Sequence, residues 1–218
     1  MSAPYPVLYS FRRCPYAMRA RLALLASGQV CELREVVLAK KPAALLLASA
    51  KATVPVLITL EGQVLAQSLE VMHWALQQQD PQHWLPATEA LQAEAQQLLA
   101  QCDGGFKFHL DRYKYSHRYA LTDGLAHRAG GVNFLAGLNQ RLGAHSHLLG
   151  QQIGLTDQAI APFVRQFAHT DPLWFAEQPW PALQTWLSDF ENSSAFVQVM
   201  KKYPPWQPEQ DPIFFPAL

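Results

Sequence analysis

Short apolar runs alternate with helical stretches through the first 79 residues of the chain. Apolar runs of about four to eight residues between turn residues are typical of buried strands, and apolar positions three or four apart are typical of helices. Strands separated by helices favour parallel pairing, and a tight turn between two strands adds an antiparallel edge. The pattern predicts strands over 6–10, 33–38, 55–60 and 63–66, and helices over 15–27, 42–49 and 68–78.

Turn and cap residues stand at the ends of these predicted elements. Pro15 fits the first helical turn, where its missing N–H costs nothing, and Gly28 fits a helix C-terminal cap. Glu61-Gly62 is expected to form the tight turn between the last two strands. Ser68 is expected to cap the helix that follows them.

After about Thr88 the pattern is helical throughout. The two prolines in residues 80–87 break helices, so this segment is predicted to link a first domain of residues 1–79 to an all-helical domain of residues 88–218. A long amphipathic helix over 91–113 is expected to bend at Gly104-Gly105, because each glycine costs about 1 kcal/mol relative to alanine. Further helices are predicted over 123–149, 155–168, 181–191 and 194–203, before an irregular surface tail.

Composition changes this picture by excluding several classes of protein. The charged residues are 16% of the chain and balance to a net charge of zero, which weighs against nucleic acid as a partner. No apolar run approaches the roughly 18 residues that span a bilayer, and no signal-peptide pattern is present, so a cytoplasmic protein without a membrane partner is expected. Three cysteines form no disulfide framework, and Cys31 and Cys102 are expected to be buried packing residues.

Cys14 is the residue with the strongest chemical signal. It stands where the first predicted strand gives way to a helix, so its thiol meets the partial positive charge and unpaired N–H groups of the helix N-terminus. Arg12 and Arg13 add to that field, and all of these effects favour the nucleophilic thiolate. The alternative is a small, inert loop residue. Ala17 stands where a Cys-x-x-Cys motif has its second cysteine, so a reactive Cys14 needs an external thiol such as glutathione.

Two further segments carry candidate chemistry. Residues 106–119 are aromatic and basic, and three interpretations are open. The segment could pack in the core with a solvated face, Arg112 or Tyr115 could line a cleft over Cys14, or the segment could bind single-stranded nucleic acid. Helical spacing and neutral charge favour packing. His145 and His147 do not share a helix face and have no further ligand at suitable spacing, so no metal site is predicted.

Four short motifs stand in register along the first 79 residues: Cys14-Pro15-Tyr16-Ala17, Lys41-Pro42, Thr53-Val54-Pro55-Val56-Leu57 and Gln67-Ser68. Together they resemble the glutathione transferase superfamily. The first 79 residues are similar to its thioredoxin-like domain, and the remainder resembles its helical second domain. The resemblance implies an α/β thioredoxin-like N-terminal domain followed by an all-α C-terminal domain. The chain resembles a bacterial-type member of the superfamily, with an active-site turn similar to that of the omega-type, cysteine-using members.

The resemblance implies that these motifs hold glutathione. A cis bond before Pro55 would leave the Val54 backbone free to pair with the cysteinyl backbone of glutathione, whereas an ordinary trans proline would only begin a strand. Gln67 and Ser68, at a helix N-terminus, would bind the γ-glutamyl group, or Ser68 would serve only as an N-cap. Lys41 would pair with the glycyl carboxylate, with Lys40 as a substitute, or remain a solvated charge.

The resemblance also implies a function. Cys14 would be the catalytic residue of a glutathione-dependent transferase or thiol reductase, with glutathione as cosubstrate and a mixed disulfide as intermediate. Tyr16, Arg112 and Tyr115 are candidates for the cleft that takes a small electrophilic or disulfide substrate, and a homodimer is implied. Two alternatives stay open: conjugation of glutathione without covalent Cys14 chemistry, and a non-catalytic interaction protein.

A segment of the second half also resembles the superfamily. Residues 154–162 are similar to its buried capping segment, in which an acidic residue reaches back to the start of a core helix. Asp157 is therefore expected to support folding rather than catalysis.

Overall fold

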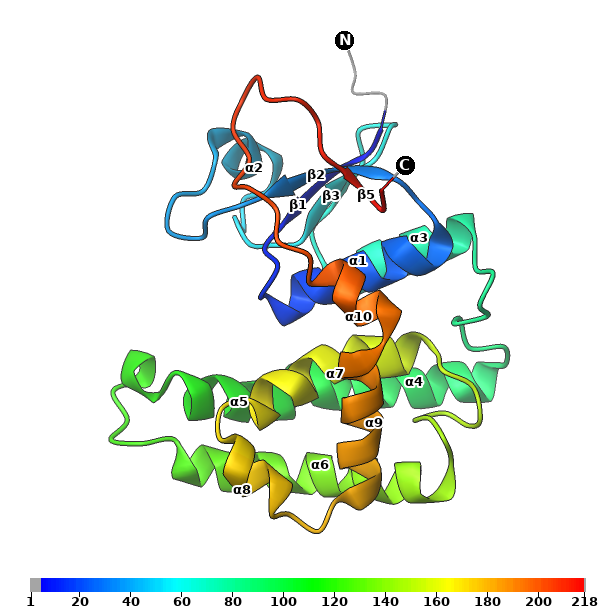
Figure 1. Cartoon of the computed structure of the whole chain (residues 1–218), viewed down its shortest axis with the longest axis vertical. Coiled ribbons are helices and arrows are strands. Elements are labelled where there is room, and N and C mark those ends of the chain that lie inside the picture. Colours follow the sequence, from blue (N-terminus) through cyan, green and yellow to red (C-terminus); the bar gives the residue numbers. More distant parts are fainter. Residues whose placement is uncertain (1–4, 218) are drawn as a thin grey trace. The chain divides into compact units, whose positions relative to one another are not determined.

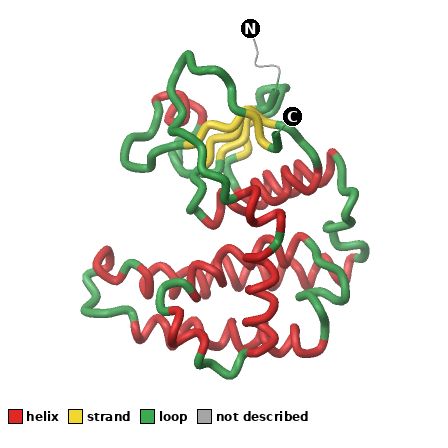
Figure 2. The backbone as a smooth tube through the Cα atoms, in the orientation of Figure 1, coloured by secondary structure: helices red, strands yellow, loops and turns green. Residues whose placement is uncertain are grey.

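The computed structural model describes residues 5–217 of the chain, which form two compact units. One unit joins the residues up to Leu85 with those from Ser194 onward, and the other is Pro86–Ser193. Figure 2 shows that the first contains all the strands and the second is built of helices and loops. The segment from Ser194 onward therefore belongs to the α/β unit, whereas the sequence pattern assigns it to the helical domain.

A five-stranded mixed sheet of order β4-β3-β1-β2-β5 forms the centre of the first unit. Its fold is the α/β, thioredoxin-like one that the sequence predicts. Parallel pairing occurs between β1 and β2, but β3 also follows a helix and yet pairs antiparallel with β1. The strands are β1 (Val7–Ser10), β2 (Cys31–Glu35), β3 (Val56–Ile58), β4 (Val64–Leu65) and β5 (Phe214–Phe215).

Two helices, α1 (Pro15–Ser27) and α3 (Ser68–Gln78), pack side by side on one face of this sheet (Figure 1). Nearly every side chain of α1 is buried, because α3, the sheet and α10 (Ser194–Val199) all pack against it. The short helix α2 (Ala43–Ala48) contacts β3. Side chains on all sides of α1 are therefore fixed by tertiary contacts.

The predicted caps are confirmed at two glycines and wrong at one serine. Gly28 ends α1 with a φ of 69°, and Gly62 turns the hairpin with a φ of 82°, both in the left-handed region that favours glycine. The N-cap of α3 is Gln67, and Ser68 is the first helical residue. The physical reason is Glu70, whose carboxylate accepts a hydrogen bond from the Gln67 backbone N–H at 3.1 Å.

The sequence pattern predicts a wholly irregular C-terminal tail, but part of the tail forms a strand. Phe214 and Phe215 form β5, which pairs with Cys31 and Glu32 at the edge of β2. Phe215 is 2% exposed, so burial of its ring anchors β5 on the sheet. The helix before the tail is also shorter than predicted, because α10 ends at Val199.

The second unit opens on a long helical segment that departs from regular α-helix at the position where the sequence predicts a bend. Helix α4 (Glu89–Gln101) passes through a π-helical turn (Cys102–Phe106) into α5 (Lys107–Lys114). Gly104-Gly105 lies within that turn, and both glycines would tolerate an added Cβ without contact. The helix therefore widens locally at this turn, which two residues of low helix propensity favour.

The rest of this unit is α-helical around a central helix. Helix α7 is buried almost throughout and contacts α4, α5 and α9. The Phe167 ring of α7 lies 5.5 Å from that of Phe106 and 4.9 Å from that of Tyr113, which joins three helical segments in one aromatic core. Helix α6 ends before the predicted limit of residue 149, and α8 was not predicted. The helices are α6 (Leu125–Ala144), α7 (Leu155–Ala168), α8 (Pro172–Ala176) and α9 (Pro181–Asn192), with a short 3₁₀ turn at Ser116–Tyr119.

Asp157 has the structural contacts expected of a folding residue. Its carboxylate accepts hydrogen bonds from the backbone N–H of Gly154 at 3.1 Å and of Leu148 at 3.0 Å. It also accepts one from the Trp186 indole at 3.0 Å, so a single buried carboxylate joins the start of α7, the preceding loop and α9.

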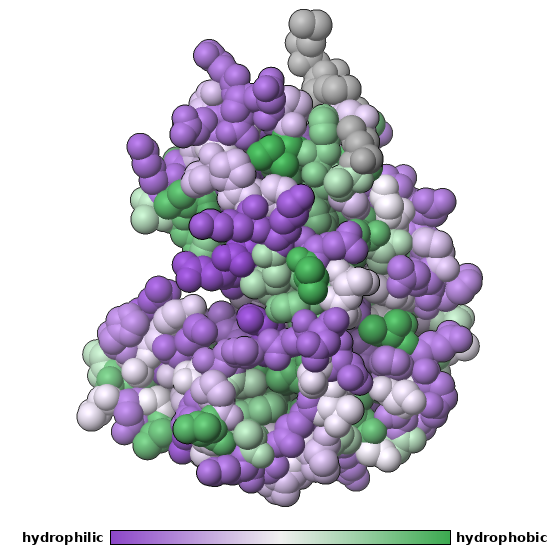
Figure 3. Space-filling model, viewed as in Figure 1, coloured by the Kyte–Doolittle hydropathy of each residue, from purple (hydrophilic) through white to green (hydrophobic). Residues whose placement is uncertain are grey.

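The surface is mostly polar on the face drawn in Figure 3, with separate small hydrophobic areas. Within residues 5–217, none of the helices has the length and apolar character needed to cross a bilayer.

Candidate active site

Cys14 ends a tight turn and begins α1. The turn Phe11–Cys14 is closed by the Cys14 N–H, which donates to the Phe11 carbonyl oxygen at 2.9 Å. Cys14 is the N-cap, with extended backbone (φ −79°, ψ 122°), and Pro15 occupies the first helical position. Met18 donates its backbone N–H to the Cys14 carbonyl oxygen at 2.9 Å, the first bond of the helix. The thiol therefore lies at the positive end of a well-packed helix.

The Cys14 sulfur also lies beside the start of β3. Its Sγ is 3.7 Å from the Val54 carbonyl oxygen, close enough for the S–H group to donate a weak hydrogen bond. The Val54–Pro55 peptide bond is cis. The thiol is half-buried, so a ligand that pairs with the Val54 backbone would meet the sulfur directly.

One hydrophobic cluster adjoins all four motifs singled out in the sequence. Its buried members come from β1, α1, α2, β3 and the residues just after β2 and just before β3. Cys14, Ala44 and Ala66 pack at its rim; Ala66 directly precedes Gln67-Ser68, and Ala44 follows Lys41-Pro42 by two residues. The fold therefore gathers motifs that are far apart in the chain. The buried members are Val7, Tyr9, Ala17, Val36, Leu45, Val54 and Val56.

The N-terminus of α3 offers anion-binding groups. Ser68 is buried in the first turn, and among residues 5–217 its hydroxyl has no hydrogen-bond partner. Gln67 is exposed, and the Glu70 carboxylate lies against its backbone N–H. Sequence reasoning missed Glu70, although its spacing three residues after the N-cap is the signature of a capping box.

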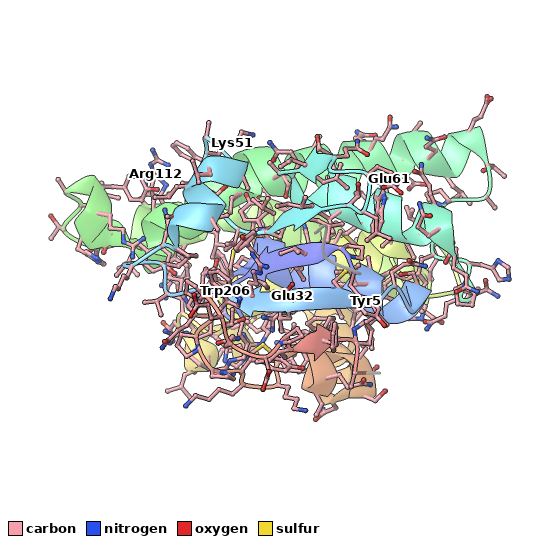
Figure 4. The ribbon with its side chains drawn as sticks, turned by 90° about the horizontal axis from the view of Figure 1, so that it is seen from above. Tyr5, Glu32, Lys51, Glu61, Arg112 and Trp206 are labelled. Atoms are coloured by element: carbon pink, nitrogen blue, oxygen red, sulfur yellow. The ribbon has the colours of Figure 1, made fainter. Side chains whose placement is uncertain are left out.

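Lys41 is half-buried on the wall of a groove of about 580 Å³. Lys40 lines the same groove, and neither lysine forms an ion pair within the described part of the chain. The opposite wall is Pro205–Pro208 of the C-terminal segment. Trp206 of this wall lies beside β2, as Figure 4 shows, with the Arg34 guanidinium 4.4 Å from its ring centre.

The three predicted cleft residues have ring and cation contacts within their own units. The Tyr16 ring is 5.5 Å from the Arg19 guanidinium in α1. In the second unit, Arg112 stacks between two rings, 3.6 Å from the centre of Phe108 and 4.3 Å from that of Tyr119. The Tyr115 ring lies 4.2 Å from the Arg118 guanidinium. These contacts restrict the side chains of Arg112 and Tyr115.

The other two cysteines are unsuited to nucleophilic chemistry. Cys31 and Cys102 are completely buried. Burial raises the pKa of the Cys31 thiol to about 12, so it stays protonated at neutral pH. Across residues 5–217, the His, Cys, Asp and Glu side chains form no group of three or more that could hold a metal ion.

Two protein-family models match the sequence. The model of the glutathione S-transferase N-terminal domain matches residues 8–84, and that of the glutathione S-transferase C-terminal domain matches residues 86–189. A comparison of the sequence with curated proteins gives no match.

Solved structures with the same fold include three informative ones. A glutathione transferase family member from Pseudomonas fluorescens, solved with two glutathione bound, has a TM-score of 0.78 at 18% identity, over 90% of this chain and 92% of that one. A glutathione transferase from Burkholderia graminis, with two glutathione molecules bound per subunit, has a TM-score of 0.78 at 21% identity, over 90% and 87%. Glutathione transferase Omega 3C from Trametes versicolor has a TM-score of 0.76 at 21% identity, over 91% and 85%.

Proposed function

Because the chain belongs to the glutathione S-transferase family, we propose that it is a glutathione-dependent thiol transferase with Cys14 as its nucleophile. The observation that carries this proposal is the position of the Cys14 sulfur, at the N-terminus of α1 and 3.7 Å from the Val54 carbonyl oxygen. A helix N-terminus favours the thiolate, and the neighbouring backbone suits a peptide thiol. The omega-like character of the turn is part of the proposal.

Glutathione would bind through the motifs around the hydrophobic cluster. Its cysteinyl backbone would pair with the N–H and C=O of Val54, like an added strand before Pro55. The γ-glutamyl carboxylate would accept hydrogen bonds at the start of α3, from the Ser68 hydroxyl and the backbone N–H groups there. Gln67 would contact the same γ-glutamyl group, and Lys41 would pair with the glycyl carboxylate.

The reaction would proceed as two thiol–disulfide exchanges. The Cys14 thiolate attacks the glutathione sulfur of a glutathionylated disulfide, the substrate S–S bond breaks, and the substrate thiolate leaves and takes up a proton. The product on the protein is a mixed disulfide of Cys14 and glutathione. A second glutathione, as thiolate, attacks the glutathione sulfur of that bond, which releases oxidised glutathione and restores the Cys14 thiolate.

The remaining expectations belong to the same proposal. Tyr16, Arg112 and Tyr115 are proposed to contact the second substrate, a small disulfide or electrophile. The proposed setting is the reducing cytoplasm, where glutathione is abundant, and the proposed assembly is a homodimer.

Two assays on matched variants test the proposal. Glutathione-dependent reduction of hydroxyethyl disulfide and conjugation of chlorodinitrobenzene are measured on wild type, Cys14→Ser and Cys102→Ala. Selective loss of disulfide reduction in Cys14→Ser, with reduction retained in Cys102→Ala, is the expected result. Undiminished reduction in Cys14→Ser contradicts the proposed nucleophile. Conjugation that is equal in wild type and Cys14→Ser, without any disulfide reduction, favours conjugation as the activity instead.

A further inference from the structure

Glu35, at the end of β2, is bonded to the turn that precedes Cys14. Its side chain is 10% exposed, and its Oε1 accepts a hydrogen bond from the Arg12 backbone N–H at 2.7 Å. The closing bond of the Phe11–Cys14 turn uses the Cys14 N–H and leaves the Arg12 N–H without a partner in the turn. Glu35 is therefore the acceptor that fixes the second residue of the turn.

The other carboxylate oxygen of Glu35 pairs with Arg21, which is completely buried in α1. Burial lowers the pKa of Arg21, and the charge of Glu35 opposes that shift. The Arg21 Nε donates to the Ser10 hydroxyl at 2.9 Å. This ion pair thus joins the end of β1, the end of β2 and the middle of α1 around the candidate nucleophile.

The C-terminal segment completes this network. The carbonyl oxygens of Val199 and Met200, at the end of α10, accept hydrogen bonds from Arg21 at 3.0 Å and from the Arg12 side chain at 3.2 Å. The last carbonyls of a helix lack intrahelical partners, and arginine side chains satisfy them well. Farther on, the Trp206 backbone N–H donates to the Glu35 carbonyl oxygen at 2.7 Å.

We propose that Glu35 is a positioning residue for Cys14, and that the C-terminal segment from Val199 to Trp206 holds the Cys14 turn through Arg12 and Arg21. The proposal deepens, and rests on, the proposed role of Cys14. The sulfur reaches the N-terminus of α1 and the Val54 carbonyl only when the Phe11–Cys14 turn keeps its shape. Residues near the end of the chain are thereby part of the active site.

Charge and position act in opposite directions on the Cys14 thiol. Loss of the Glu35 charge by itself makes the thiolate easier to form, because a nearby negative charge disfavours a second one. Loss of the hydrogen bond to Arg12 frees the turn and moves the sulfur away from the helix N-terminus, which makes the thiolate harder to form. The sign of the change therefore separates positioning from simple electrostatics.

Two double variants provide a charge-matched test. Both variants remove the two charges of the buried ion pair at once: one is Arg21→Met/Glu35→Gln and the other is Arg21→Met/Glu35→Leu. Loss of both charges is often tolerated, whereas loss of one partner leaves the other charge buried and unpaired. Only the first keeps a carbonyl oxygen for the Arg12 N–H. The readout is the rate of Cys14 alkylation by iodoacetamide between pH 5 and 10, followed on the Cys14 peptide by mass spectrometry.

The expected result is a difference between the two double variants. At pH 7, Arg21→Met/Glu35→Leu alkylates about tenfold more slowly than wild type, equivalent to about 1.4 kcal/mol, and its pH midpoint rises. Arg21→Met/Glu35→Gln stays within about twofold of wild type, since one hydrogen bond distinguishes the pair. Equal rates in the two variants, whether fast or slow, overturn the positioning role. Urea denaturation shows whether both are folded.

A second pair of variants tests the C-terminal link and does not touch the buried ion pair. Arg12→Ala and Arg13→Ala each remove one positive charge from the turn, but only Arg12 reaches the Met200 carbonyl oxygen. Arg13 is exposed, with its guanidinium 5.5 Å from the centre of the Phe11 ring. We expect the pH midpoint of Cys14 alkylation to rise more in Arg12→Ala than in Arg13→Ala. Equal midpoints in the two variants overturn the proposed link between the C-terminal segment and the Cys14 turn.

The alkylation readout also separates this proposal from the proposed function. Iodoacetamide reports on the Cys14 thiol without glutathione or a disulfide substrate. If Cys14 of the wild type is alkylated fast and the two double variants are alkylated at equal rates, the positioning role is overturned and the proposed function is left intact. If Cys14 alkylation is fast and depends on Glu35, but the protein reduces no disulfide, the proposed function is overturned and the positioning role is supported.

Discussion

The Cys14 sulfur and the Val54 carbonyl oxygen lie 3.7 Å apart, although one residue begins the first helix and the other precedes β3. This contact brings the nucleophile candidate to the backbone that would hold a peptide ligand. It also leaves Cys14 half-buried, whereas Cys31 and Cys102 are fully enclosed. The three thiols are thus in different environments.

Selective alkylation follows from these environments. We expect iodoacetamide at pH 7 to modify one thiol per native chain, at Cys14. Cys31 is enclosed and its pKa is raised to about 12 by burial, so its thiolate population is negligible, and Cys102 is equally enclosed. Intact-mass measurement before and after unfolding in guanidinium should give one and then three modifications. Modification of Cys31 or Cys102 in the folded protein would contradict the structure.

Ser68 is expected to contribute to glutathione affinity rather than to helix stability. Since Gln67 is the N-cap of α3, Ser68→Ala removes no cap and should leave the melting temperature unchanged. Loss of a hydrogen bond of about 1 kcal/mol to the γ-glutamyl group should raise the Kd for glutathione roughly fivefold. Calorimetric titration measures both proteins, with Ser194→Ala at the start of α10 as the control. An unchanged Kd would remove Ser68 from the proposed site.

Two glycines in α6 should respond oppositely to alanine. A Cβ at Gly131 would lie 2.7 Å from a ring carbon of Phe167, whose side chain is fixed in the core. Gly131→Ala should therefore lower the free energy of unfolding by about 1–3 kcal/mol. Gly137 has open space around it, so Gly137→Ala should raise that free energy by up to about 1 kcal/mol. Urea unfolding compares the two, and equal effects would count against the packing of α6 on α7.

Acid should destabilise the protein through His127. Its Nδ1 lies 3.0 Å from that of His109, and its pKa is lowered, first by burial and then by the charges of His109 and Arg112. Above pH 6.5 the imidazole is neutral in both states and has no effect. As the pH falls below 6.5, the unfolded chain takes up a proton that the folded chain resists, so stability falls until the folded His127 also becomes protonated.

The variant His127→Gln tests this pH dependence. Its melting temperature should fall less between pH 7 and pH 5 than that of wild type, whereas the exposed His145→Gln should follow wild type. Part of the fall in melting temperature at acid pH should remain in all three proteins, because burial also lowers the pKa of His73 in α3. If the melting temperature of His127→Gln falls between pH 7 and pH 5 as much as that of wild type, His127 is not a cause of the acid destabilisation.

Local signals predicted much of this structure. Pro15 and Gly28 delimit α1 because their backbone preferences are intrinsic. An irregularity of the helix at Gly104-Gly105 was predicted from helix propensity alone, although its π-helical form was not. The N-cap of α3 was predicted one residue late, because Ser68 has a strong cap preference and the competing bond from Glu70 depends on the folded turn.

Other features gave weak signals or none. Helix α8 has visible signals in Asp171, whose carboxylate caps it, and in Pro172 at its first position, but it is too short for a periodic pattern. Strand β5 consists of Phe214 and Phe215, and two residues have no alternation to detect. Its existence depends on the free edge of β2.

Residue type and spacing along the chain were enough to predict the alternation of strands and helices, the family resemblance and the choice of Cys14 as the candidate nucleophile. Tertiary contacts were needed to show that the C-terminal segment returns to the first unit and that Glu35 bonds to both Arg12 and Arg21. A buried ion pair forms where folding excludes water and brings opposite charges together, and neither condition is a property of a short sequence window. The environment of the Cys14 turn is therefore set by residues far away in the chain.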